Sequence, residues 1–69
     1  MLEGKYVLKK GDYYLSDIMV NEGKLVNFAI DSDYRKLYDD FELAEEDRKL
    51  IFIETGLDLV VKKFKEKED

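Results

Sequence analysis

Apolar and polar residues alternate along the first thirty positions of the chain, in three runs separated by glycine-containing turns. The runs are residues 5–10, 13–20 and 24–30. A period of two is typical of half-buried β-strands. The dipeptide Gly11-Asp12 is a two-residue hairpin signal, and Asn21-Glu22-Gly23 predicts a three-residue loop closed by a bulge. The pattern therefore predicts three antiparallel strands joined by two tight turns.

The three-residue loop would set the register of the second hairpin, with Ile18 opposite Val26 and Ser16 opposite Phe28. One face of the sheet then collects the apolar residues that a covering layer would bury. They are Tyr14, Ile18, Val20, Val26, Phe28 and Ile30.

The opposite face of the same strands also carries large apolar residues, interrupted by Asp17 and Asn27. They are Tyr6, Leu8, Tyr13, Leu15, Met19 and Leu25. A sheet covered on one side should be polar on its other side. The sequence predicts only one long helix, which can cover only one face. We therefore expect these six residues to form a protein-binding face. The alternative is that side chains at the sheet edges, or the segment 31–40, shield this face within the monomer.

The spacing in "FELAEEDRKLIFIETG" predicts the main helix over residues 41–56, with Gly56 as a left-handed cap. Residues 31–40 predict a short turn or a single helical coil, with Asp31, Ser32 or Asp33 as its cap. Residues 49–55 could instead belong to a β-hairpin, because the periodicity of a short apolar run does not distinguish a helix from a strand. Residues 57–64 return as a last strand.

The predicted order is thus β-β-β-α-β, an α+β fold in which one helix packs on one face of an antiparallel sheet. With 69 residues we expect one domain over residues 1–64 and a charged tail over 65–69. A core this small is marginal. The chain has no cysteine and no histidine, so neither a disulfide nor a thiolate or imidazole metal site is expected. We therefore expect association with a partner or with a second copy to supply part of the stability.

Charge and hydropathy indicate in which cellular compartment the protein acts and which class of partner it does not bind. No apolar run reaches the length of a signal peptide or a membrane span, and cysteine is absent, so we expect a cytoplasmic protein. The net charge of −5 argues against direct binding to nucleic acid, which needs a basic surface.

The densest charge lies between residues 31 and 47, where eight acidic side chains face two basic ones. A calcium loop starting at Asp31 fails, because Arg35 and Lys36 occupy its ligand and glycine positions. An acidic surface that imitates DNA phosphates towards a nucleic-acid-processing protein is an alternative function. Its residues would be Asp39, Asp40, Glu42, Glu45, Glu46 and Asp47.

Catalytic chemistry has little support in the sequence. The aliphatic hydroxyls are Ser16, Ser32 and Thr55, and no histidine can activate them. No phosphate-binding or dinucleotide motif is present. We expect a protein without enzymatic activity and without a cofactor.

The stretches "GKYVLKKGDYYLSDIMVNEGKLVNFAIDSDYRKLYDDFELAEE" and "TGLDLVVKKF" resemble small open reading frames of phages and prophages in low-GC Gram-positive bacteria. Asp47 and Arg48 depart from that pattern, which has an apolar residue near this point of the helix. The resemblance implies a phage or prophage context and no particular chemistry; accessory proteins of that class often act by binding a host protein. Together these observations predict a protein-interaction module that binds a host protein or a second copy of itself.

Overall fold

The computed structural model describes residues 5–64, and its elements follow the predicted order β-β-β-α-β. They are β1 (Lys5–Lys10), β2 (Tyr13–Asn21), β3 (Lys24–Asp31), α1 (Phe41–Thr55) and β4 (Val60–Phe64). The α+β prediction is confirmed, and the rival hairpin at residues 49–55 is not formed because α1 continues through them. The predicted tail at 65–69 lies outside the described residues.

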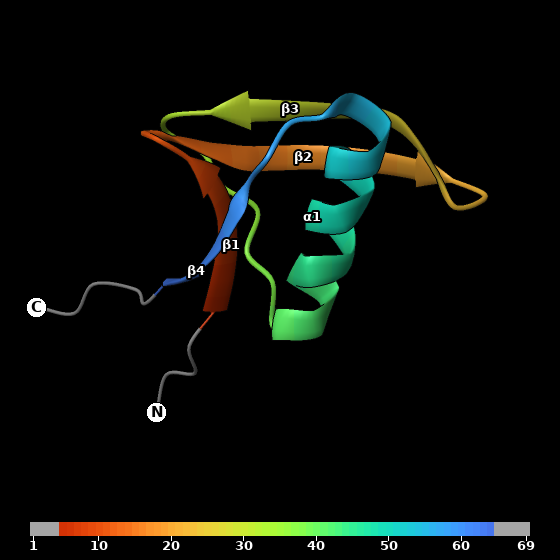
Figure 1. Ribbon diagram of the computed structural model, residues 1–69. Coiled ribbons are helices and arrows are strands. Elements are labelled where there is room, and N and C mark those ends of the chain that lie inside the picture. The colour runs from red at the N-terminus through yellow and green to blue at the C-terminus, as the bar shows by residue number, and fades with distance from the viewer. Residues whose placement is uncertain (1–4, 65–69) are drawn as a thin grey trace, which may run out of the picture.

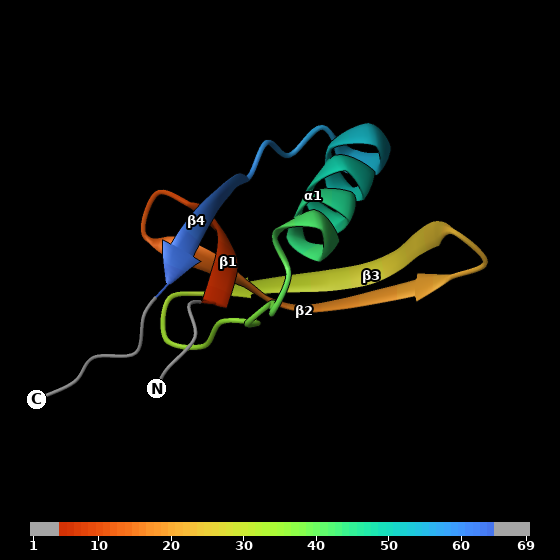
Figure 2. The same ribbon diagram turned by 90° about the horizontal axis from the view of Figure 1, so that it is seen from below.

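The four strands form one antiparallel sheet in the order β3-β2-β1-β4. β1 and β4 lie side by side and run steeply across the long β2–β3 hairpin, with α1 in the corner between the two pairs (Figures 1 and 2). In both views the far end of the β2–β3 hairpin extends beyond α1. The Cα radius of gyration is 12.1 Å, above the ~11 Å expected for a compact chain of this length.

The first hairpin turn is as predicted, and the second is not. Lys10 pairs with Tyr13, so Gly11 and Asp12 form a two-residue turn. At the second turn Asn21 pairs with Lys24, which leaves only Glu22 and Gly23 in the loop. Both have positive φ, 54° and 77°, as a type I′ turn requires. The predicted three-residue loop is therefore wrong, and Glu22 adopts the left-handed conformation that favours Gly or Asn.

Local signals explain where α1 begins and ends. The Asp40 side chain accepts a hydrogen bond from the Glu42 backbone N–H at 3.1 Å, which satisfies one of the free donors of the first turn. At the other end Gly56 has a φ of 83°, and its N–H donates to the Phe52 carbonyl at 2.8 Å. Both features are those of a helix with a side-chain N-cap and a left-handed C-cap.

The connection between β3 and α1 passes from one side of the sheet to the other (Figure 2). It starts with an Asp31 turn, in which the side chain accepts from the Asp33 N–H at 2.7 Å. Of the two predicted forms, a short turn or a single helical coil, the turn is the one that forms, with Asp31 as its cap, and residues 34–37 have no regular secondary structure. β1 and β2 pair only next to their turn, and the connection fills the gap beyond: Lys36 N–H donates to the Leu15 carbonyl, and Tyr38 bridges Tyr6.

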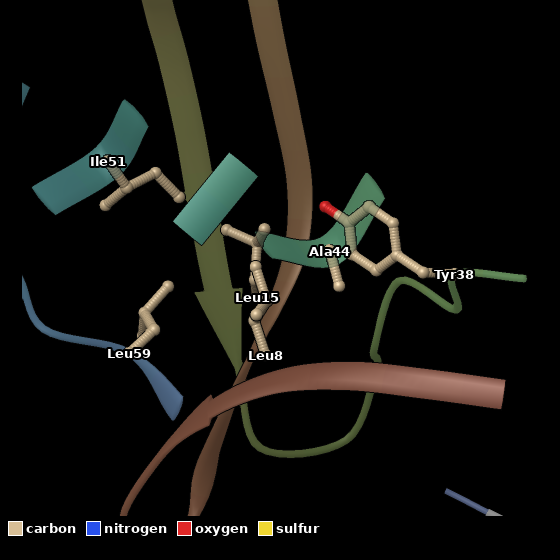
Figure 3. Close-up of a cluster of buried hydrophobic side chains, with 6 residues drawn as sticks. All are labelled: Leu8, Leu15, Tyr38, Ala44, Ile51 and Leu59. Atoms are coloured by element: carbon tan, nitrogen blue, oxygen red, sulfur yellow. The ribbon is translucent and has the colours of Figure 1, made fainter. Parts of the chain in front are cut away.

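The core lies between α1 and the sheet. Its buried members come from β1, β2, the connection, α1 and the segment before β4 (Figure 3): Leu8, Leu15, Tyr38, Ala44, Ile51 and Leu59. Tyr38 ties the connection to the helix, since its hydroxyl donates to the Asp47 carboxylate. Burial, and then this hydrogen bond, raises the pKa of Tyr38 above its ordinary value.

Candidate functional site

The structure places most of the predicted protein-binding face inside the molecule. Leu8 and Leu15 have no exposed surface, and Tyr6 and Leu25 pack against the core. The expectation that these four residues lie on an uncovered face is therefore wrong. Of the six, Tyr13 and Met19 are exposed, with 52% and 57% of their surface accessible.

The cause is that α1 covers the face that carries Leu8 and Leu15, while two irregularities in the β2–β3 ladder change which residues of the hairpin share that face. Register shifts occur between Leu15 and Asp17 and between Met19 and Val20. A bulge adds one residue to one strand and so changes which side chains point to which face.

On β2, both Leu15 and Ile18 reach the core, although strict alternation would put them on opposite faces. On β3, Leu25 and Phe28 do the same. The residues between them are turned away from α1. Apolar residues that the sequence assigns to two faces are thus collected on the face that α1 covers.

The other face of the sheet is covered in part by the connection. Arg35 lies between two aromatic rings, with its Cζ atom 4.5 Å from the Tyr14 ring centroid and 4.9 Å from that of Phe64. These are cation–π distances. The connection therefore shields the face that carries Val7, which is also buried. The alternative that residues 31–40 shield the face of Tyr6 and Leu8 holds only through Tyr38, which joins α1 in covering that face. Nothing in the sequence pattern singled out Arg35 for this place.

One of the open apolar surfaces lies on residues 17–31 of the β2–β3 hairpin, which we call the arm and whose far end extends beyond α1 (Figure 1). Four of its large apolar side chains are about half exposed: Met19 (57%), Val20 (43%), Val26 (56%) and Ile30 (43%). Val20 lies opposite Leu25 on the face towards α1, whereas Met19 and Val26 lie on the face away from it. The arm therefore has apolar surface on both faces. Of the residues predicted to bind protein, it retains Met19 and the partly buried Leu25.

The edges of the arm are also unpaired among the described strands. β3 is the end strand of the sheet, and β1 leaves β2 after Tyr14. Two backbone donors on these edges are satisfied by the side chain of the preceding residue. Ile18 N–H donates to Asp17 Oδ1 and Phe28 N–H to Asn27 Oδ1, both at 2.9 Å. Side-chain capping of this kind occurs where no neighbouring strand accepts the bond.

The alternative acidic surface is largely engaged in contacts within the chain. Lys5 forms an ion pair with Asp39, Asp40 caps the helix, and Asp47 accepts from Tyr38. Arg48 Nη2 lies 2.7 Å from a Glu45 carboxylate oxygen, and this hydrogen bond lowers the pKa of Glu45. Glu42 and Glu46 are exposed on the outer side of α1. The six carboxylates thus have five separate structural contexts and do not form one open array.

The described part of the chain offers neither a metal-binding cluster nor a membrane-spanning helix. Residues 5–64 contain no group of three or more His, Cys, Asp or Glu side chains placed to hold a metal ion. Within the same residues, no helix has the length and apolar character needed to cross a membrane.

Comparison with known proteins gives no relative. No protein-family model matches the chain, and neither the curated proteins nor the solved structures contain a match to it.

Proposed function

We propose that this chain is a non-enzymatic binding protein that contacts another protein through the arm. The observation that carries the proposal is the set of half-exposed apolar side chains on the arm, with Met19 and Val26 on its outer face and Val20 and Ile30 on the face towards α1. Exposed apolar surface of this kind is typical of interaction sites. Unpaired strand edges add main-chain donors and acceptors that a partner can use.

The arm supports this function better than the acidic run supports imitation of DNA. Binding through the arm uses apolar side chains that are about half exposed in the folded chain. An acidic surface would need carboxylates that already cap the helix, pair with Lys5 or accept from Tyr38. We extend the proposal to a cytoplasmic accessory protein of a phage or mobile element, on the strength of the resemblance in the sequence.

Affinity capture from a lysate of a Gram-positive bacterium tests the proposal. The bait is the full chain, and the arm variant is M19K/V26K, which changes two half-exposed residues on the outer face. The matched control is Ile53→Lys, on the outer side of α1, where 76% of the residue surface is exposed. Circular dichroism should show both variants folded.

We expect a protein that is retained by the parent chain and by the control, at low and at high salt, and that M19K/V26K loses. Apolar contacts survive salt, whereas charge imitation weakens as the Debye length falls to about 3 Å near 1 M. The chain could instead retain DNA-binding proteins at low salt only, with no effect of M19K/V26K. This result would contradict binding through the arm and favour binding through the acidic surface.

A further inference from the structure

We propose that the arm binds a second copy of this chain, with β3 of each copy paired antiparallel to β3 of the other around a twofold axis at Ala29. The inference rests on the proposed function, since it names the partner of the same surface. It would join the two sheets into one through their β3 edges.

The two outer strands of the sheet differ in how they are protected. β4 carries Lys62 and Lys63 in the middle of its five residues, and lysines at such positions hinder pairing with another strand. In β3 the six residues between its terminal Lys24 and Asp31 are uncharged, "LVNFAI". Of the two edges, β3 is therefore the one suited to accept a strand.

The hydrogen bonds of β3 show which backbone groups face outward. The Ala29 carbonyl accepts from Ser16 Oγ of β2 at 3.1 Å, so the polar groups of Ala29 point towards β2. In an antiparallel strand this direction alternates, so those of Phe28 and Ile30 point to the free edge. The Phe28 N–H confirms this, because its acceptor is the neighbouring Asn27 side chain and not β2.

Only certain registers bring these outward groups together. Pairing Phe28 with Ile30 of the second copy lets each residue exchange two hydrogen bonds with the other, and the twofold axis repeats the exchange. Ala29 then lies opposite its own copy, in the closely spaced type of pair where a small side chain fits. The Asn27 amide, released from the Phe28 N–H, lies opposite Asp31 of the second copy and can donate to it.

The side chains agree with the same register. Phe28 packs against the core and Ile30, 43% exposed, lies on the same face, opposite Leu15. The pairing would place each beside the other's copy and cover the open part of Ile30. Ala29 lies on the face away from α1, and so does its copy, so no residue of the pair needs to change face.

Charge favours an antiparallel arrangement over a parallel one. β3 begins with Lys24 and ends with Asp31, and Asp33 follows two positions later. Antiparallel pairing brings the basic start of one copy towards the acidic end of the other, at both ends of the interface. Parallel pairing would place like charges together, which is destabilising across a sheet.

Cysteine cross-linking tests the register, because the chain contains no cysteine of its own. In the proposed dimer the two Cα atoms of residue 29 are about 4.5 Å apart, within the range that a disulfide spans. Ala29→Cys is therefore the test variant. Val26→Cys is the control: it lies on the same strand and outer face with 56% exposure, but about 20 Å from its copy in this register.

We expect Ala29→Cys to form a disulfide dimer under mild oxidation at least about tenfold faster than Val26→Cys, because a paired edge raises the effective concentration of the two thiols. The parent chain should sediment as a concentration-dependent dimer, and Ile30→Lys should sediment as a monomer. Ile30 is half exposed in the monomer, so this variant should still fold; Val60→Lys, on β4 and 50% exposed, is its matched control.

Equal cross-linking rates for the two cysteine variants, or a parent chain that stays monomeric, would overturn self-pairing. The capture experiment separates this failure from failure of the proposed function. A monomeric chain whose arm still retains a lysate protein, lost in M19K/V26K, would leave the proposed function standing. A monomeric chain with no arm-dependent protein would overturn both.

Discussion

Strict alternation along β2 would place Leu15 and Met19 on the same face of the sheet, but a bulge between them places them on opposite faces. Replacing each of the two residues by alanine tests this arrangement. Leu15 has no exposed surface and contacts the core, whereas Met19 is 57% exposed. Leu→Ala at a buried site removes transfer free energy and leaves a cavity, at a cost of about 3 kcal/mol. At Met19 more than half of that transfer free energy is absent and no closed cavity forms, so we expect less than about 1 kcal/mol.

The difference is large for a domain of this size, which has a free energy of unfolding of roughly 3–10 kcal/mol. Urea unfolding followed by circular dichroism at 222 nm measures it. With a slope near 1 kcal/mol per M, Leu15→Ala should lower the midpoint by about 3 M and Met19→Ala by less than about 1 M. If Leu15→Ala does not fold, Leu15→Val removes a single methylene and should cost about 1 kcal/mol.

The result that would refute this reasoning is an equal loss of stability for the two alanine variants. It would mean that Leu15 and Met19 share one environment, as strict alternation across β2 requires. The arm would then lose its definition, because the bulges are what turn Met19 outward and Leu15 inward.

Three further predictions concern single contacts. Tyr38→Phe should cost about 1–2 kcal/mol by removing the hydroxyl donor to Asp47. Because the pKa of Tyr38 is raised in the folded state, its contribution is complete below the ordinary tyrosine pKa of about 10 and declines at higher pH. Urea midpoints from pH 8 to 11 should therefore fall less steeply in the Phe variant. Asp40→Ala should cost about 1 kcal/mol as a lost N-cap, against less than about 0.5 kcal/mol for Asp39→Ala, whose ion pair is exposed; thermal unfolding compares them. Glu22→Asn should stabilise the folded chain by about 0.5–1 kcal/mol, because Glu22 has a φ of 54°, which asparagine adopts more readily than glutamate. An unchanged or lower melting temperature would contradict the two-residue turn with Glu22 in the left-handed conformation.

The open β3 edge also has a consequence for the behaviour of the protein at high concentration. An edge whose central residues include no lysine or proline is an aggregation hazard unless it is paired. A dimer of the proposed register would close this edge in both copies and leave the lysine-bearing β4 at the ends of the joined sheet. The marginal core of a chain this short would gain stability from the same contact, and the gain would rise with protein concentration.

Local signals were sufficient for the order of the elements. The Gly11-Asp12 turn and the Gly56 left-handed cap each depend on residues next to one another, and both are found where the sequence places them. The same holds for the alternation of β1, where Tyr6 and Leu8 share one face. These features follow from backbone conformation and helix-end hydrogen bonding, which neighbouring residues decide. The Asp40 N-cap was not predicted, although it lies directly before the predicted helix start at residue 41.

The faces of the β2–β3 hairpin could not be obtained in this way. Glu22 in a two-residue turn and the two bulges change the register, and a change of one residue moves a side chain to the other face of the sheet. Nor does any local signal place Arg35 between Tyr14 and Phe64, or Tyr38 in the gap between β1 and β2. These contacts join positions far apart in the chain.

The sequence by itself thus determined the fold class, the C-cap of α1 and the first turn, because each is encoded by residues close together along the chain. Only the tertiary structure decided which apolar residues are core and which are surface. The reason is that α1 buries Leu8 and Leu15 by covering one face of the sheet, and the bulges then determine that Met19 and Val26 remain open on the arm.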